Sequence, residues 1–484
     1  MKKKRNQNIF RIVIVIPFII GVIGNLQAGH ALNDSLYCTF CYYFVSVYQN
    51  SADNFLMELS RWTAPLVTVT GVLYALRGLF QSAFNYLKSL RGDSVVIYYD
   101  KDPNAVRVLS ESIPHSFTQE VSEENPGHVF GNVNTQICFF SEDAENLNFY
   151  EKNYEVLKDK DVYMKMVELD VNLFRPNNIH FFNLFEVISA KYWKKFPIVT
   201  EEETLEDEYH IAIVGSSTLT QDLLVQGILH NIFFDNQRIV YHIYGNSEIN
   251  QYYKYIPLMN NDEIIVSEKS IMASLAEMKT MDRIILTDRK NESILENLIY
   301  ACPDVPIYYF AENSVNPARF FRAKSIHAFG QQQNVLTKEN IIGEKAFRKA
   351  KLIHFLTVKP DEIQEAKKND KILDAEWMKL DGFMQSSYWA IINYYQLYAQ
   401  LLESGIKLSM DPKEIVKLEH IRWCRFYFLN HWQFGIPEDG ALRDSAKRIH
   451  RSLVPFEELR EEDINREQAR VEFLISSHDA HKTE

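Results

Sequence analysis

The chain has 484 residues, 46% of them apolar and 24% charged, and a formal net charge of −12. This length exceeds what one ordinary hydrophobic core holds, so we expect two to four domains. The acidic balance argues against nucleic-acid binding by the chain as a whole. Five cysteines do not indicate a disulfide framework. Cys38 and Cys41 have no second pair and no paired histidines to complete a metal site, so no metal is expected.

The first 91 residues predict a membrane hairpin. Residues 9–28 carry Arg11 as their only charge, and a helix of about 20 such residues covers a bilayer core of roughly 30 Å. A second apolar run, residues 62–87, is interrupted only by Arg77. These two runs are the expected membrane spans.

Basic residues on both flanks orient this hairpin. Lys2 to Arg5 and the basic residues of 77–91 would lie on the cytoplasmic side. We therefore expect a multi-pass protein of the inner membrane, in contact with its lipid, with the bulk of the chain cytoplasmic. A cleaved signal peptide is the alternative for residues 1–28, because small residues follow the apolar run.

Residues 92–205 predict a degenerate Rossmann-like unit. The apolar run "SVVIYYD" reads as a buried parallel strand, and strand-like and helix-like stretches alternate after it. Asp100, Lys101 and Asp102 stand where a pyrophosphate would need close, uncharged backbone. A dinucleotide is therefore not expected at this turn.

Residues 206–357 predict a second doubly wound, Rossmann-like unit. In "HIAIVGSSTLTQDLLVQGIL", Gly215 stands at the turn after a strand, with Ser216, Ser217 and Thr218 at the start of a helix. Free N–H groups at a helix start form an anion site, which makes these four residues candidates for cofactor binding. The G-x-G-x-x-G pattern is absent. A bound nucleotide and a purely structural scaffold both remain open.

Residues 370–478 predict a mainly helical domain, within which "LEHIRWCRFYFLNHWQFG" (418–435) reads as a helix. At 100° per residue, Glu419, Arg422, Trp423 and Phe426 share one face. Aromatic surface beside Glu and Arg suits the stacking and hydrogen bonding of a flat base. The alternative is a structural domain in which the tryptophans pack and Glu419 pairs with Arg422 within one turn.

The layout resembles bacterial two-span membrane proteins in which TrkA-N (RCK-like) Rossmann units precede a ryanodine-receptor-type (RyR) domain. The stretches "RWTAPLVTVTGVLYALRGLF", "IHFFNLFEVISAKY" and "HIAIVGSSTLTQDLLVQ" carry the first part of the likeness. The positions that match the RyR pattern are Ser386, Glu419, Arg422, Trp423, Trp432, Gly435, His450, Leu453, Pro455, Phe456 and Leu459. The sequence departs from that pattern at Ser387, Tyr388, His431 and Arg451.

The resemblance implies an adenine-nucleotide pocket between tryptophans, formed by Trp423, Trp432 and either Tyr388 or Trp389. It implies a membrane-embedded, homo-oligomeric ligand-sensing protein, either a channel-like effector or an ion-transport regulator gated by a nucleotide. Antiphage defence signalling is an extrapolation from this architecture.

Two other function classes stay open at this point. The first is a non-conducting regulatory subunit of a potassium transporter. The second, an NAD-dependent enzyme, is disfavoured because both glycine fingerprints are broken. His420, His431 and His450 have no evident nucleophile partner in the sequence, so no catalytic set is expected.

Overall fold

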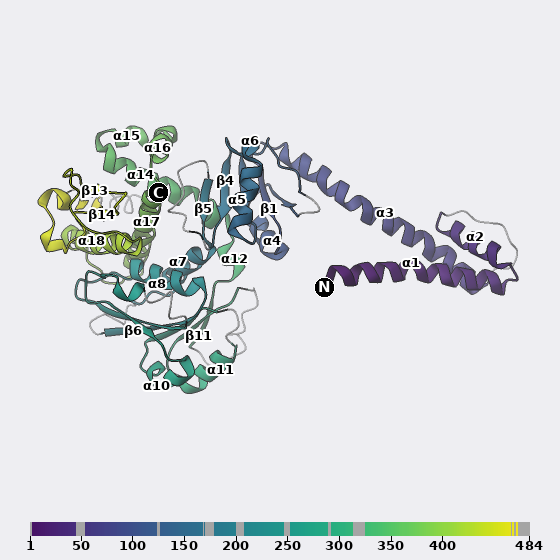
Figure 1. The fold of residues 1–484 in the computed structure, drawn as a ribbon, viewed down its shortest axis with the longest axis horizontal. Helices are drawn as coiled ribbons and strands as arrows, with labels where there is room; N and C mark the ends of the chain where they lie inside the picture. The colour runs from purple at the N-terminus through teal and green to yellow at the C-terminus, as the bar shows by residue number, and fades with distance from the viewer. Residues whose placement is uncertain are drawn as a thin grey trace. The chain divides into compact units, whose positions relative to one another are not determined.

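The computed structural model describes residues 2–44, 54–122, 126–167, 169, 179–199, 208–245, 252–288, 292–312, 325–465, 467–468 and 471–472. The chain forms two compact units, Met1–Arg91 and Gly92–Glu484. Figure 1 shows the elements of both units, with labels that are kept below.

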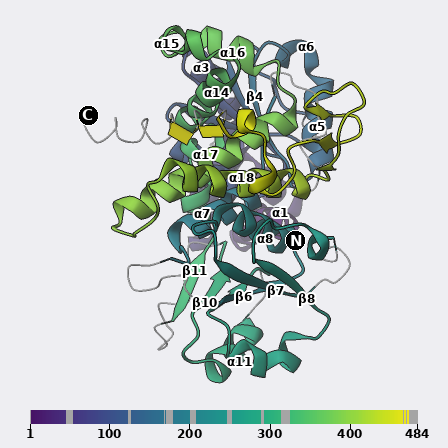
Figure 2. The same ribbon diagram turned by 90° about the vertical axis from the view of Figure 1, so that its left-hand side faces the viewer.

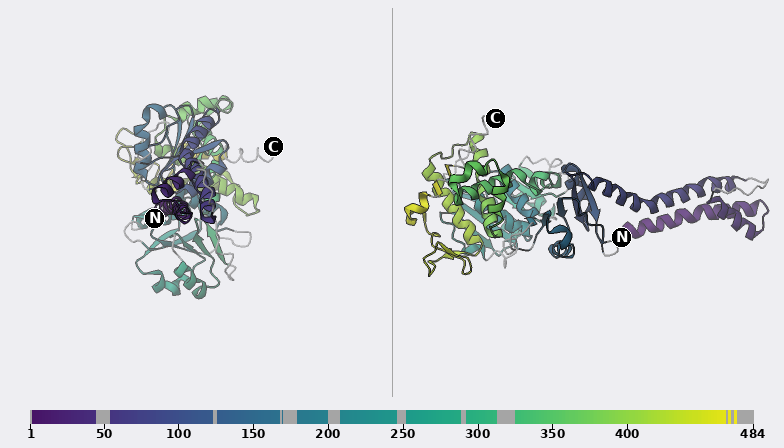
Figure 3. Two further views of the ribbon diagram at one scale, coloured as in Figure 1. Left: turned by 90° about the vertical axis from the view of Figure 1, so that its right-hand side faces the viewer. Right: turned by 90° about the horizontal axis from the view of Figure 1, so that it is seen from above.

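The first unit is helical, with α1 (Lys2–Gln27), α2 (Leu32–Tyr42) and α3 (Phe55–Ser89). Helices α1 and α3 run side by side (Figure 3). The Ser60 hydroxyl donates to the Pro17 carbonyl at 2.8 Å, and the Asn54 amide donates to the Gly24 carbonyl at 2.7 Å. Glycine at 24 permits this approach, because a Cβ there would lie 2.8 Å from the Met57 backbone nitrogen.

The predicted membrane hairpin is wrong. None of the helices in the described ranges is both long and apolar enough to span a membrane. In α1 the uninterrupted apolar stretch is confined to residues 12–24, between Arg11 and Asn25, and a run of that length is shorter than the roughly 20 residues that a span requires. This finding also contradicts the predicted inner-membrane localisation.

The second unit begins with a five-stranded sheet in which every pairing is parallel. Its strands are β1 (Val95–Tyr99), β2 (Ser116–Glu120), β3 (Thr135–Cys138), β4 (Asp161–Lys165) and β5 (Ile179–Phe182). Its helices are α4 (Pro103–Ser112), α5 (Asp143–Lys152) and α6 (Tyr154–Leu157). The order β2-β1-β3-β4-β5 is the flavodoxin-like form of the doubly wound fold. The predicted α/β architecture of this region is therefore confirmed.

A six-stranded parallel sheet follows, in the order β11-β10-β9-β6-β7-β8. Its strands are β6 (Glu208–Gly215), β7 (Arg238–Gly245), β8 (Glu263–Ser267), β9 (Arg283–Leu286), β10 (Ile307–Phe310) and β11 (Ile326–Phe329). Numbered from β6, this order is the Rossmann arrangement 3-2-1-4-5-6. Helices α7 (Leu184–Lys195) and α8 (Thr218–His230) cover one face, and α10 (Leu275–Met278) and α11 (Glu292–Ala301) cover the other (Figures 1 and 2).

The C-terminal region adds a further helical layer. Its helices are α12 (Gln332–Val335), α13 (Lys338–Ile341), α14 (Glu344–Val358), α15 (Ile363–Ala366), α16 (Asp370–Trp377), α17 (Gly382–Glu403) and α18 (Pro412–Leu429). A small sheet contains β12 (Gln433–Phe434), β13 (Arg443–Asp444) and β14 (Ile449–His450). Helices α17 and α18 pack on α8, so that α7 and α8 lie between them and the six-stranded sheet (Figure 2). One apolar core cluster contains residues of the six-stranded sheet, of α7 and α8, and of α14, α16, α17 and α18.

Candidate functional site

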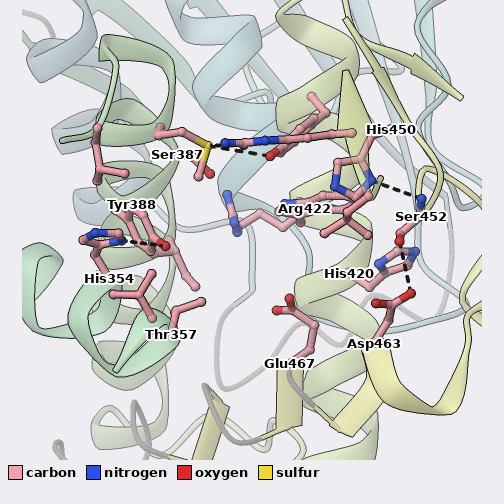
Figure 4. Close-up of a pocket in the computed structure, with 18 of the residues that line it drawn as sticks. His354, Thr357, Ser387, Tyr388, His420, Arg422, His450, Ser452, Asp463 and Glu467 are labelled. Atoms are coloured by element: carbon pink, nitrogen blue, oxygen red, sulfur yellow. Dashed lines mark hydrogen bonds between the residues drawn. The ribbon is translucent and has the colours of Figure 1, made fainter. Parts of the chain in front are cut away.

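A pocket of 390 Å³ opens within the C-terminal helical region (Figure 4). This volume lies near the lower end of the roughly 300–1,000 Å³ that small-molecule sites occupy. Helices α14, α17 and α18 supply most of its wall, and Leu380 and the segment after α18 supply the rest. The polar and aromatic residues that line it are His354, Thr357, Ser387, Tyr388, His420, Arg422, Trp423, Tyr427, Arg443, His450, Ser452, Asp463 and Glu467.

Helix α18 places charged side chains in a buried setting. Asp411 caps its first turn by accepting the Lys413 backbone N–H at 3.0 Å. Glu419, Arg422 and Arg425 follow, and none of the three is more than 1% exposed. Buried charges are stable only when they are paired and hydrogen bonded, so the partners of these residues determine what each can do.

Arg422 has an incomplete set of partners. Its Nε and Nη2 donate to the two carboxylate oxygens of Glu419 at 2.7 and 2.8 Å, a bidentate pair within one turn. Burial, the largest single influence, opposes the Arg422 charge, but the charge and hydrogen bonds of Glu419 together with Tyr395 and Tyr394 raise the Arg422 pKa above its ordinary value. Nη1 is buried, and none of the described residues accepts a hydrogen bond from it. The Arg422 side chain lies between Tyr388 and His450 in the pocket (Figure 4).

Arg425 instead has an acceptor for each of its three nitrogens in the Rossmann-like unit. Its Nε donates to the Leu258 carbonyl at 2.7 Å, and its Nη1 donates to the Ile228 carbonyl at 2.8 Å. Its Nη2 donates to Asn260 Oδ1 at 2.6 Å and to the buried Asp262 carboxylate at 2.7 Å. These bonds fasten α18 to the Rossmann-like unit.

The Trp423 ring forms an aromatic wall of the pocket. It stacks on the His420 ring with centroids 5.7 Å apart, and its centroid lies 4.4 Å from that of Tyr427 and 4.8 Å from that of His450. His420 Nε2 lies 2.8 Å from the Val454 carbonyl, so this nitrogen carries a proton. Burial lowers the His420 pKa, which keeps the imidazole neutral at pH 7. A partly exposed indole beside neutral rings suits a flat ligand.

The opposite wall comes from α14 and α17. His354 Nδ1 lies 3.2 Å from the Tyr388 hydroxyl, which ties the two helices together at the pocket. In Figure 4, both side chains lie across the pocket from His420 and Ser452. A ligand in this space would therefore contact α14 and α18 at once.

The segment after β14 adds polar groups. The Ser452 backbone N–H donates to His450 Nδ1 at 3.1 Å, so in the neutral ring the proton lies on Nε2. The Ser452 hydroxyl donates to Asp463 Oδ2 at 3.2 Å rather than to a histidine. This differs from a nucleophile activated by a histidine base. The arrangement is suited to hydrogen bonding a ligand.

Three of the predicted RyR-like site residues, Tyr388, Arg422 and Trp423, line the pocket, and Glu419 lies behind Arg422 as its partner. Phe426 and Trp432 do not line it, because they pack in a core cluster where Trp432 stacks on Phe383 with centroids 5.2 Å apart. Trp389 is also outside the lining and lies close to Gly343.

The end of α18 explains why Trp432 does not line the pocket. The expected helix over 418–435 stops at Leu429, with Asn430 as its C-cap. His431 then adopts a left-handed conformation with φ 63°. Trp432 therefore leaves the helical register and turns into the core.

Several lining residues were not predicted from the sequence. His354, Arg443, Asp463 and Glu467 belong to three separate stretches of the sequence. For Asp463 and Glu467 the sequence offers one indication, because their spacing of four places both side chains on one face of a helix. For His354 and Arg443 it offers none, because only the fold brings them to this site.

The predicted anion site at Gly215, Ser216, Ser217 and Thr218 has the expected strand, turn and helix start. However, the Ser216 backbone N–H already has an acceptor within the chain. The Ser216 backbone N–H donates to Asp288 Oδ1 at 3.0 Å. The turn also packs closely against β9, since a Cβ at Gly215, where φ is +153°, would clash with the Thr287 hydroxyl. A carboxylate of the chain thus stands where a phosphate oxygen would bind.

The part of the chain that the structure describes contains no group of His, Cys, Asp and Glu side chains that could hold a metal ion. The chain matches no protein-family model and no curated protein sequence.

Proposed function

We propose that this chain is a small-molecule sensor that binds a nucleotide-type ligand in the pocket between α14, α17 and α18. The observation that carries the proposal is the Arg422 guanidinium, which is buried, held by Glu419, and has no acceptor for Nη1 among the described residues. A buried donor without an acceptor costs about 1–3 kcal/mol. A ligand oxygen at this point would remove that cost.

The remaining lining favours a flat, polar ligand. Trp423 offers a ring face, while Tyr427 and His450 border it. Asp463 and Glu467 offer acceptors to the amino groups of a nucleobase. A purely apolar ligand would displace water from these charged groups, which is unfavourable.

The packing of the pocket walls gives a route from binding to response. The Tyr394 hydroxyl of α17 donates to the Ile232 carbonyl, just after α8, at 2.8 Å. Arg425 connects α18 to the same Rossmann-like unit. A ligand that binds one arrangement of α14, α17 and α18 more tightly than another shifts the population of the arrangements. The six-stranded sheet would then sense the change through α8.

Calorimetric titration of the full chain with nucleosides and nucleotides tests this proposal. We expect at least one of these compounds to bind the wild type, and Trp423→Ala to weaken that binding at least tenfold by removing the stacking surface. Trp389→Ala is the matched control, because it removes an indole from α17 that does not line the pocket. Wild-type affinity in Trp423→Ala, or equal losses in both variants, would contradict the proposal.

A further inference from the structure

Helices α7 and α8 pack side by side (Figure 2) and bring two carboxyl groups together away from the pocket described above. Gln226 Nε2 of α8 donates to Glu186 Oε1 of α7 at 3.3 Å. Asp222 lies one helical turn before Gln226, so the two side chains are neighbours on one face of α8. Gln226 thus fixes Glu186 and Asp222 around one point, and none of the described Lys, Arg or His side chains lowers the pKa of either carboxyl group.

The Asp222 carboxyl group has an acceptor that nothing in the described chain uses. Its Oδ2 is buried and receives no hydrogen bond from the described residues. Burial, and after it the Glu186 charge, raises the pKa of Asp222 well above its ordinary value. A buried carboxylate without a donor is unfavourable, because it loses its hydration and gains no partner. A hydrogen-bond donor with a positive charge would offset both the burial and the repulsion.

A buried hydroxyl group faces the same part of α8. Ser189 is fully buried, and its Oγ has no hydrogen-bond partner among the described residues. Glu186, Ser189 and Trp193 lie on one face of α7, at spacings of three and four. Both ends of this row contact α8, because Trp193 Nε1 donates to the Leu223 carbonyl at 2.9 Å and Glu186 is bonded as above. Ser189 therefore faces the turn of α8 that Asp222 begins.

We propose that this place between α7 and α8 binds the primary ammonium group of a small amine, with Asp222, Glu186 and Ser189 as its acceptors. An ammonium group has three N–H donors and no acceptor, so it fills the two oxygens that lack a donor and balances the Glu186 charge. A metal ion fits less well, because the described residues include no group of His, Cys, Asp and Glu side chains that could hold one. Glu186 is exposed, which leaves the amine a path from solvent. This second site does not depend on the nucleotide-type ligand proposed above.

Melting curves of the full chain test the proposal with ethylammonium, tetramethylammonium, potassium, magnesium and calcium chlorides at equal ionic strength. We expect ethylammonium, at about ten times its dissociation constant, to raise the melting temperature by about 2 °C. Tetramethylammonium carries the same charge but has no N–H donor, so it should give little or none of that shift. Equal shifts with the two organic cations, a shift with a metal ion alone, or no shift with ethylammonium would overturn the proposal.

Variants locate the ammonium group. Asp222→Asn keeps the size of the side chain but removes its charge, and it should abolish the ethylammonium shift. Ser189→Ala should weaken ethylammonium binding about tenfold, because a hydrogen bond to a charged group is lost. It should leave the melting temperature of the free chain unchanged, since Ser189 Oγ bonds none of the described residues.

The matched control is Asp304→Asn, which removes an exposed carboxylate of the same Rossmann-like unit and should respond as the wild type does. A wild-type response in Asp222→Asn, or an equal loss in Asp304→Asn, would contradict the assignment. If Asp222→Asn does not fold, Ser189→Ala decides the question, because a wild-type response in that variant contradicts the assignment as well.

Discussion

Two buried arginines lie three residues apart on α18 and differ in how many of their guanidinium nitrogens have hydrogen-bond acceptors. Arg425 donates from Nε, Nη1 and Nη2 to acceptors of the Rossmann-like unit. Arg422 donates from Nε and Nη2 to Glu419, and its Nη1 has no acceptor among the described residues. Both side chains are almost fully buried, so burial alone does not separate a structural arginine from a binding one. The completeness of the acceptor set separates them.

The largest expected effect comes from removing the structural arginine. Arg425→Ala leaves the Asp262 carboxylate buried without its cation, and breaking such a pair costs about 3–5 kcal/mol. Urea unfolding followed by tryptophan fluorescence measures this loss. Lys413→Ala, at an exposed position of the same helix, should change the free energy of unfolding by less than about 0.5 kcal/mol. If Arg425→Ala lowers the free energy of unfolding by less than about 1 kcal/mol, Arg425 does not have the structural role that distinguishes it from Arg422.

A pH effect of nearly the same size is expected from His230, which ends α8 near both arginines. Burial, helped by the Arg422 charge, lowers the His230 pKa to about 4. Between the unfolded pKa of 6.5 and this value, the unfolded chain binds a proton that the folded chain does not. Acidification from pH 7 to pH 4 should therefore remove about 3 kcal/mol of stability through this residue.

The control for this effect is His230→Gln, which keeps a polar side chain but cannot titrate. Its stability should fall less steeply than that of the wild type over this pH range, as measured by urea unfolding at each pH. Parallel curves for the two proteins would show that His230 does not carry the effect.

Arg422→Lys tests whether the other arginine of this comparison, Arg422, contacts the ligand. Lysine keeps a cation beside Glu419 but lacks the planar fork that places one nitrogen in the pocket. We expect the affinity for the tightest-binding nucleotide to fall about tenfold, or about 1.4 kcal/mol, measured by calorimetry. The melting temperature should fall less than in Arg425→Ala, and unchanged affinity would mean that Nη1 does not contact the ligand.

The smallest effect is expected at the Rossmann-like turn. Asp288→Ala removes the acceptor of the Ser216 N–H, and water can replace it because Ser216 is exposed. The cost should be about 0.5–1.5 kcal/mol. The variant should also gain a small thermal stabilisation from inorganic phosphate that the wild type lacks. If the wild type responds to phosphate equally, Asp288 does not close this site.

Periodicity and strand patterns in the sequence were sufficient to predict the parallel α/β sheets. Their strands contain short apolar runs, such as β1 and residues 211–215 of β6, which are almost wholly buried. The membrane hairpin was predicted from the apolar content of residues 9–28 and 62–87, but none of the helices in the described ranges is both long and apolar enough to span a membrane. Apolar content alone did not distinguish these helices from membrane spans.

The pocket was only partly predictable. Arg422 and Trp423 follow from helical spacing, because one turn of α18 fixes their relation. Trp432 does not, because the left-handed His431 breaks that spacing.

His354 and Arg443 reach the pocket through tertiary packing, which no local sequence pattern predicts. The Asp288 contact that closes the Rossmann-like turn bridges 72 residues and was invisible for the same reason.

The most direct test of the central claim is the mass spectrum of small molecules released from purified wild-type and Arg422→Lys chains after exposure to the same cell extract. If Arg422 Nη1, which has no acceptor among the described residues, marks a ligand site, the wild type should retain a nucleotide-type compound, and the variant should retain much less. Equal amounts of the same compounds in both proteins, or no nucleotide-type compound in either, would contradict the claim.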